Sequence, residues 1–136
     1  MKLLLFYAHS FSYKTAAKSL PAVPDVKKRE SVADAAVIFF HVEAEDVEKR
    51  SKVVQKFVKN VKWLCGKFST RSVVLHSFNH LSGSKAEPGF SKELLDEVVE
   101  RLERTDFQVM VTPFGYFNEF KIHVAGDSLA KVFKEF

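Results

Sequence analysis

Apolar residues form alternating or unbroken runs at six places along the chain. These runs predict β-strands over residues 2–8, 11–14, 35–43, 72–77, 107–112 and 116–124. The run over residues 35–43 is apolar almost throughout, which is typical of a central strand covered on both faces.

Two other segments carry apolar residues at helical spacing. They predict a helix over residues 46–67 and a second over residues 92–104, with Ser91 as the N-cap of the second. A short terminal helix is predicted over residues 128–133. Residues 16–34 hold two prolines and the run Lys27-Lys28-Arg29-Glu30, which predicts an exposed loop.

This order of elements predicts an α/β (α+β) fold, a β-sheet core flanked by two long helices and a short C-terminal helix. A length of 136 residues fits one domain with its own hydrophobic core. We therefore expect residues 1–136 to form a single domain. Because the sequence stops at Phe136 without a cap or tail, we also expect that domain to be the N-terminal part of a longer protein.

Composition narrows the classes of partner and compartment. The net charge of +4 is compatible with a polyanionic partner. The single cysteine, Cys65, cannot form an internal disulfide, and we expect it to be a buried, unreactive thiol in a reducing compartment. No stretch approaches the roughly 20 apolar residues of a membrane span, so we expect no membrane contact and a cytoplasmic protein.

The common cofactor and metal motifs are missing from the sequence. There is no G-x-G-x-x-G, Walker loop, H-E-x-x-H or cluster of Cys and His, so we expect no cofactor or metal. His41, His76 and His123 fall inside predicted strands and are expected to be structural. His80 just follows a strand end, where loops carry function, and is therefore a candidate site residue.

The densest stretch is VTPFGYFNEFKIHV, residues 111–124. Pro113 and Gly115 frame a turn, and a strand of interleaved aromatic and polar residues follows. Phe117 is out of step with Phe120 and its successors, which predicts that the two faces of this strand exchange roles near Asn118. The turn could form the rim of a ligand site or a hairpin over an aromatic core, and the residues alone do not decide between them.

Three segments together resemble one family. SFNHLS (residues 77–82), PFGYFNEFKI (residues 113–122) and GDSLA (residues 126–130) are similar in order and spacing to segments of the archaeal threonyl-tRNA synthetase N-terminal editing domain. The resemblance implies a D-aminoacyl-tRNA deacylase-like fold, usually a homodimer. It also implies hydrolysis of serine mischarged on threonine tRNA, with threonine spared.

The implied chemistry requires little from the protein. An ester between an amino acid and the terminal adenosine can be cleaved by a placed water, with backbone donors for the carbonyl oxygen and help from the adenosine 2′-hydroxyl. Serine lacks one methyl of threonine, a difference of roughly 1–3 kcal/mol that a synthesis site exploits poorly, so a second, tighter site is needed.

The resemblance also implies the site residues. The catalytic candidates are His80, Tyr116, Asn118 and Lys131. The substrate-binding candidates are Val42, Ser77, Phe78, Asn79, Ser91, Phe114, Gly115 and Phe117. Three of these depart from the family pattern: Asn118 replaces a lysine, Lys131 a glutamate and Phe117 a tyrosine.

Other functions remain open at this point. A free-standing D-aminoacyl-tRNA deacylase is the first, although its S-Q-F-T and G-P-V-T signatures are missing. A non-catalytic module that binds aminoacyl-RNA is the second, and an interaction domain with an aromatic core is the third. The expected partners are a tRNA 3′ end carrying serine, a second copy of the chain, and synthetase catalytic and anticodon-binding domains acting in cis or in trans.

Overall fold

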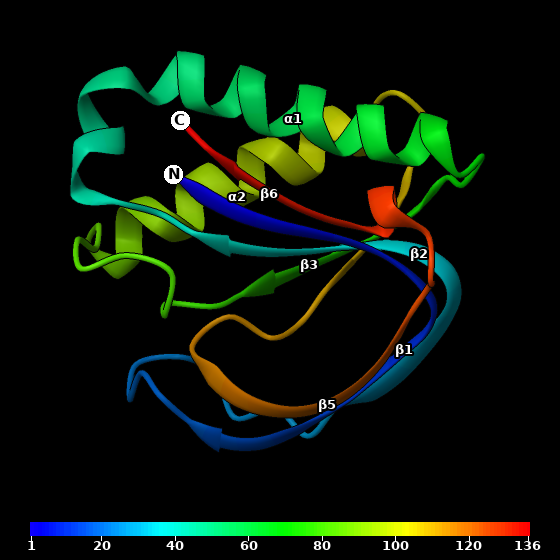
Figure 1. The fold of residues 1–136 in the computed structure, drawn as a ribbon. Helices are drawn as coiled ribbons and strands as arrows, with labels where there is room; N and C mark the ends of the chain where they lie inside the picture. Colours follow the sequence, from blue (N-terminus) through cyan, green and yellow to red (C-terminus); the bar gives the residue numbers. More distant parts are fainter.

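A single six-stranded sheet runs through the whole chain, and both long helices cover one part of it (Figure 1). The computed structural model describes residues 1–136. The strands are β1 (Lys2–Lys18), β2 (Arg29–His41), β3 (Ser72–Ser77), β4 (Gln108–Val111), β5 (Tyr116–Val124) and β6 (Lys131–Glu135). The helices are α1 (Arg50–Lys67) and α2 (Pro88–Glu103), with short 3-10 helices η1 (Ala44–Lys49) and η2 (Ser128–Ala130).

The strand order places both helices on the same face. The sheet runs β4-β3-β2-β1-β5, with β6 pairing β1 beside the same edge as β5. Strands β2, β3 and β4 are parallel neighbours joined through α1 and α2. Because such crossovers are right-handed and both proceed in the same direction across the sheet, α1 and α2 lie on one face. The carboxyl ends of these three strands consequently meet at one edge.

The hairpin of β1 and β2 bends sharply in the middle. Leu3 and Leu5 of β1 face the helices, whereas Phe11 and Tyr13, also at odd positions, belong to a cluster on the other face. The alternation therefore shifts phase at His9, where β1 also carries an extra residue against β5. In β2 the opposing Asp34 has a φ of +52°. Figure 1 shows the sheet curling back on itself beyond this point.

Two hydrophobic cores result from the bend. The larger contains 20 buried residues between the helices and the flat part of the sheet. The smaller contains seven buried residues inside the curl. Cys65 lies in the larger core, and burial raises the pKa of its thiol to about 11, which confirms that it is a buried cysteine.

The predicted loop over residues 16–34 is wrong for nearly half its length. Strand β1 continues through His9 and Ser10 to Lys18, so the two predicted N-terminal strands are one, and β2 starts at Arg29. The outer face of the curl carries no helix, so its strand residues are polar and resemble those of a loop. Only the inner face keeps apolar residues.

The predicted helix ends also need correction. The terminal helix is only the 3-10 turn Ser128–Ala130, and the residues after it pair with β1 as strand β6. Helix α2 begins at Pro88, a favoured first helical residue, with Glu87 as N-cap, so Ser91 lies in the first turn. The segment before α1 is 3-10 rather than α-helical. The strands predicted over residues 72–77 and 116–124 are confirmed to the residue.

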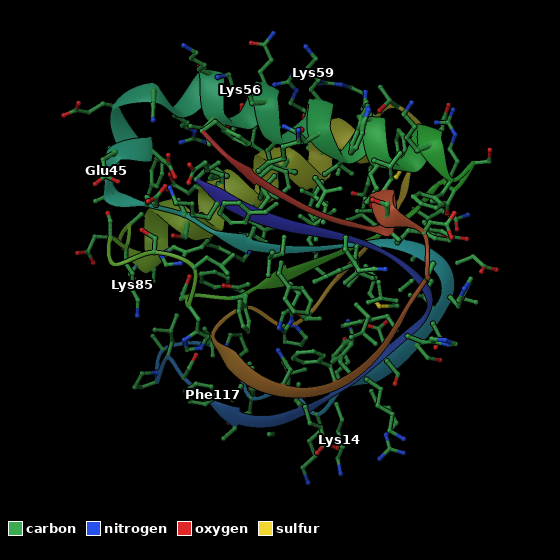
Figure 2. All side chains as sticks on the ribbon, in the orientation of Figure 1. Lys14, Glu45, Lys56, Lys59, Lys85 and Phe117 are labelled. Atoms are coloured by element: carbon green, nitrogen blue, oxygen red, sulfur yellow. The ribbon has the colours of Figure 1, made fainter.

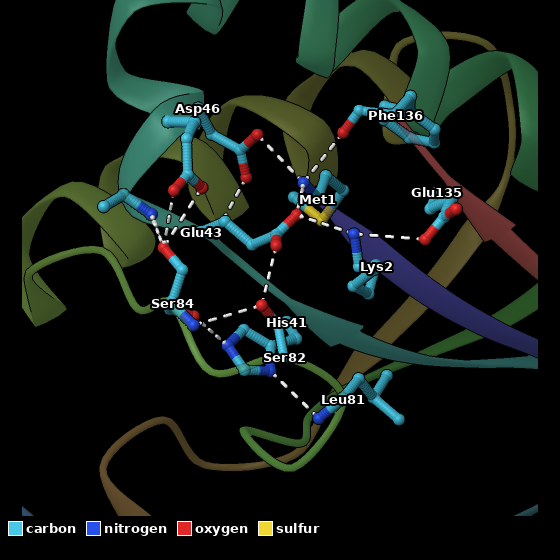
Figure 3. A network of polar contacts seen from close by, with 12 residues as sticks. Met1, Lys2, His41, Glu43, Asp46, Leu81, Ser82, Ser84, Glu135 and Phe136 are labelled. Atoms are coloured by element: carbon cyan, nitrogen blue, oxygen red, sulfur yellow. Dashed lines mark hydrogen bonds and ion pairs between the residues drawn. The ribbon is translucent and has the colours of Figure 1, made fainter.

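A buried charge network joins the chain ends to the start of η1 (Figure 3). The Met1 ammonium is fully buried and donates to the Asp46 carboxylate at 2.9 Å and to the Phe136 carbonyl at 2.8 Å. It also pairs with Glu43. Burial raises the pKa of the Glu43 carboxyl, but hydrogen bonds from the Met1 ammonium and the Ser82 hydroxyl outweigh burial and lower that pKa to about 2.

Replacing Asp46 with alanine should destabilise the fold strongly. The substitution leaves the buried Met1 ammonium short of a charged partner, and breaking a buried ion pair in this way costs about 3–5 kcal/mol in the free energy of unfolding. Glu48→Ala, on the exposed side of the same turn, is the matched control and should change that energy by less than ~0.5 kcal/mol. Urea unfolding measures both, and equal losses would contradict the network's role.

Candidate functional site at the strand ends

The carboxyl ends of β2, β3 and β4 form a wall made largely of hydrogen-bonded backbone. The Phe78 N–H donates to the Phe40 carbonyl at 2.9 Å, and the Thr112 N–H donates to the Leu75 carbonyl at 3.1 Å. The Ala86 N–H donates to the carbonyl of Val42 at 3.1 Å. The segments after the three strands are thus fixed to one another, and the wall has little freedom to yield.

Gly115 joins the turn after β4 to the loop after β1. Its carbonyl accepts hydrogen bonds from the N–H groups of Ser19 and Leu20 at 2.7 and 3.1 Å. Gly115 has a φ of +80°, and a Cβ there would lie 2.6 Å from Cγ1 of Val23. Glycine is therefore required on both counts, backbone conformation and space.

The Tyr116 hydroxyl is held by the same loop. It donates to the Pro24 carbonyl at 2.6 Å and accepts from the Val26 N–H at 2.7 Å. The phenol therefore positions the 19–28 loop against the strand ends. This contact spans about ninety residues of sequence, so no local pattern predicts it.

His80 and Phe78 stand at the edge of the wall. His80 is exposed, and its ring packs edge-on against that of Phe78 with a centroid distance of 4.9 Å. Phe78 in turn contacts Phe39 inside the curl, at 5.1 Å between centroids. The position of His80 after the strand end confirms where the sequence placed it. Asn79 is exposed in the turn between Phe78 and His80.

The inner face of the curl is aromatic and holds one buried imidazole. His76 lies 4.8 Å from Phe39 and 5.0 Å from Phe120, measured between ring centroids, and Nδ1 is 2.9 Å from the Thr112 hydroxyl. Burial lowers the pKa of His76 to about 4, so the ring is neutral at pH 7. This is the structural role that the sequence predicted for His76.

Asn118 lies on this inner face, opposite Thr15 of β1. Its amide nitrogen donates to the Tyr116 carbonyl at 3.5 Å, while its buried Oδ1 has no partner. A buried acceptor without a donor is unusual, and it is available to a ligand. The faces of β5 do not exchange at Asn118 as predicted: Asn118, Phe120 and Ile122 all lie on the inner side.

The sequence does not predict the polar network behind the 78–84 loop (Figure 3). His41 Nδ1 accepts from the Leu81 N–H at 3.1 Å, so Nε2 carries the proton and donates to the Ser84 carbonyl at 2.6 Å. The Ser82 hydroxyl donates to Glu43 at 2.7 Å. His41 is structural, as predicted, but its effect is to hold the loop that carries His80. Its partners are some forty residues away and left no signal in the local sequence.

Several predicted site residues turn their side chains elsewhere. Val42 is buried in the larger core and Phe114 packs against it, so both can offer backbone rather than side chain. Ser91 lies in the first turn of α2, with its N–H bonded to the Glu87 carbonyl. Ser77 is the half-buried last residue of β3, within the wall itself.

Phe117 and Lys131 lie away from the other candidates. Phe117 is 64% exposed and points away from the curl (Figure 2). Lys131 begins β6, opposite Phe6 of β1, and its ammonium donates to the Gly126 carbonyl at 3.2 Å. In Figure 1 this end of β6 lies on the side opposite the loop after β3. The fold therefore does not bring Lys131 to His80.

Two hollows lie on the curl, and His80 lines neither of them. One, of about 880 Å³, lies between the end of β1 and residues 25–29 and includes Tyr116 in its lining. The other, of about 640 Å³, lies beside it over the paired strands β2, β1 and β5. Tyr116 is the one predicted site residue that lines either hollow. No group of three or more His, Cys, Asp or Glu side chains is placed to hold a metal ion. Neither helix is long and apolar enough to cross a membrane.

The architecture places the chain in a known class. It superposes on the solved c-Myc DNA Unwinding Element Binding Protein with a TM-score of 0.63, covering 99% of this chain and 98% of that one at 14% identity. The fold is thus D-aminoacyl-tRNA deacylase-like, as predicted.

Sequence relatives give the family. Residues 1–136 match the family described as the Archaea-specific editing domain of threonyl-tRNA synthetase, and the chain belongs to it. It is 30% identical over 135 residues to the threonine–tRNA ligase of Thermococcus onnurineus and 29% identical over 142 residues to that of Hyperthermus butylicus. The matches cover 97% and 100% of this chain but only 22% and 23% of those ligases.

The buried imidazole predicts a pH dependence of stability. Unfolded His76 gains a proton near pH 6.5 and the folded residue only near pH 4, so the free energy of unfolding falls as the pH drops through that window. His76→Gln should reduce the slope of the free energy of unfolding against pH by about 1.4 kcal/mol per pH unit, which is the contribution of one proton. Exposed His123→Gln is the control. Denaturant unfolding at several pH values tests this, and an unchanged slope in the His76 variant would contradict it.

Proposed function

We propose that this domain hydrolyses L-serine mischarged on threonine tRNA and spares correctly charged threonine. The family match over residues 1–136 carries the proposal. The matched ligases are more than four times longer than this chain, so their other activities are not transferred to it. The partners we propose are the seryl 3′ end of threonine tRNA, a second copy of the chain, and synthetase catalytic and anticodon-binding domains in cis or in trans.

The side chains present favour attack by water over attack by a protein nucleophile. The thiol of Cys65 is buried and its pKa is raised to about 11. His76 is neutral and hydrogen-bonded to the hydroxyl of Thr112, but both residues are buried. Neither Cys65 nor Thr112 is therefore an exposed nucleophile, and we expect a placed water and donors for the developing oxyanion to supply the chemistry. The vicinal hydroxyl of the terminal adenosine can orient or deprotonate that water.

The backbone wall supports discrimination by size. The carbonyls of Val42 and Phe40 are each engaged by an N–H from another segment, and Gly115 is locked by the loop packed on it. Walls of this kind cannot move aside for an extra methyl group without breaking hydrogen bonds. A pocket fitted to serine therefore rejects threonine more sharply than a deformable pocket of side chains would.

Asn118 offers the one buried side-chain acceptor that has no hydrogen-bond partner. Its buried Oδ1 would be paired by an N–H or O–H of the bound aminoacyl group. Lys131 lies away from His80, so the change from the family's glutamate falls outside this cluster. Both placements favour catalysis by backbone donors and the RNA hydroxyl over catalysis by a pair of ionisable side chains.

Deacylation of seryl- and threonyl-tRNA, both on threonine tRNA, tests the function. We expect rapid loss of serine and slow loss of threonine, because the wall excludes the methyl group. Esters of D- and L-amino acids form the second arm: preference for D-esters would replace the proposal with a D-aminoacyl-tRNA deacylase. Binding without hydrolysis of any ester would identify a non-catalytic aminoacyl-RNA module instead.

Single substitutions test the source of catalysis. We expect each of three variants, His80→Ala, Asn118→Ala and Lys131→Ala, to lower the rate of serine removal by less than ~100-fold. Loss of a true general acid or base lowers a rate by about 100-fold or more. Lys131→Ala should have the smallest effect because of its distance from the wall. A larger loss from any one variant, in protein with unchanged thermal stability, would place general acid–base catalysis on that side chain.

A further inference from the structure

The tip and outer face of the β1–β2 hairpin carry a concentration of positive charge. The hollow of about 880 Å³ at this tip is lined by five basic residues and one acidic residue, namely Lys14, Lys18, Lys27, Lys28, Arg29 and Asp25. Asp25 pairs with Lys18 at 2.6 Å, and Lys28 lies 3.6 Å from Glu30. The remaining three cations, Lys14, Lys27 and Arg29, form no ion pair with any carboxylate.

Strand register places two of these cations side by side. Lys14 pairs directly with Arg29 across β1 and β2, so the two side chains share the outer face of the sheet. Figure 2 shows Lys14 pointing away from the curl. Neighbouring like charges repel each other. Glu119 of β5 lies opposite Lys14 on its other side, but no carboxylate forms an ion pair with either cation. An anion bound from solution would reduce this repulsion.

This basic hollow adjoins the strand-end wall. Tyr116 lines the hollow, and its hydroxyl is bonded to Pro24 and Val26 of the same loop. The loop is also bonded to Gly115 through Ser19 and Leu20. A ligand that extends from the wall past Tyr116 therefore reaches Lys27 and Arg29 next.

We propose that this hollow binds the phosphate backbone of the RNA strand whose 3′ end carries the ester. The inference rests on the proposed function and extends its site from the terminal adenosine to the nucleotides before it. Several cations around an open hollow suit a chain of phosphates, which lysine and arginine contact without reading sequence. The apolar lining is limited to Ala16, Ala17, Val26 and the Tyr116 ring, too little for the apolar anchor that a protein partner usually needs.

A second basic surface provides an internal control. Lys52, Lys56 and Lys59 are exposed on α1, and Figure 2 shows Lys56 and Lys59 on the side of the molecule opposite Lys14. They are a solvated helix face with no connection to the strand ends. The variants Lys14→Gln/Lys27→Gln/Arg29→Gln and Lys52→Gln/Lys56→Gln/Lys59→Gln remove the same charge from the two surfaces.

The first measurement is the binding of threonine tRNA without an attached amino acid, followed by fluorescence anisotropy across a salt series. The hairpin variant should bind roughly 10- to 100-fold more weakly near physiological salt, and its slope of log K against log salt should be shallower by about 2 to 3. The helix variant should bind close to the wild type. Equal weakening by both variants would overturn the proposal in favour of net charge alone, and no weakening by the hairpin variant would overturn it outright.

Hydrolysis separates this proposal from the proposed function. On seryl-tRNA the hairpin variant should show a raised KM and an unchanged kcat, whereas on a seryl ester of adenosine, which has no phosphate, it should match the wild type. If the wild type hydrolyses neither ester, the proposed function fails. The tRNA-binding measurement still shows in that case whether the hairpin surface binds RNA. If the hairpin variant loses binding to polyglutamate and keeps binding to tRNA, the surface serves an acidic protein and the RNA proposal is wrong.

Discussion

The bend at His9 and Asp34 determines how every other part of the structure is arranged. Both strands of the hairpin change phase there, so side chains that faced the helices are followed by side chains that face the inside of the curl. Without this change Phe11 and Tyr13 would lie on the outer, solvated face. The bend also returns the end of β1 to the carboxyl ends of β3 and β4, and the loop after β1 can therefore pack on Gly115.

A network of buried charges stabilises the other side of the sheet edge at which β2 and β3 end. The Met1 ammonium, Asp46 and Glu43 are buried together, and Glu43 passes the constraint on to the 78–84 loop through Ser82. A buried charge is tolerated only when it is paired and hydrogen-bonded, and here the pairing joins the start of β1 to the wall of the site. The loop that carries His80 is consequently anchored by residues some forty positions away in the sequence.

Periodic segments were predictable, and the departures have physical causes. The strand over residues 72–77 and the two helices bury one clear face, so their patterns determine their type. Residues 16–18 and 29–34 have the polar pattern of a loop because the outer face of the curl meets water. The motif resemblance gave the family and located His80, yet it could not orient side chains: Phe117 faces outward, and Lys131 sits on a strand at the far end of the sheet. The 19–28 loop on Tyr116 depends on contacts far apart in sequence, which no local pattern contains.

The placement of Asn118 and Lys131, two of the three residues that depart from the resembled segments, bears on the proposed chemistry. Asn118 lies inside the curl with a free acceptor, whereas Lys131 is held at the opposite end by the Gly126 carbonyl. The inner face of the curl is aromatic, and the one buried imidazole on it, that of His76, is neutral. In such a setting of low dielectric constant, a fixed backbone dipole acts on a developing charge far more strongly than it does in water. An ionisable group there would instead lose its charge to desolvation, as His76 does. This favours the proposal that oriented N–H groups and a hydroxyl brought by the substrate, rather than acids and bases of the protein, supply the catalysis.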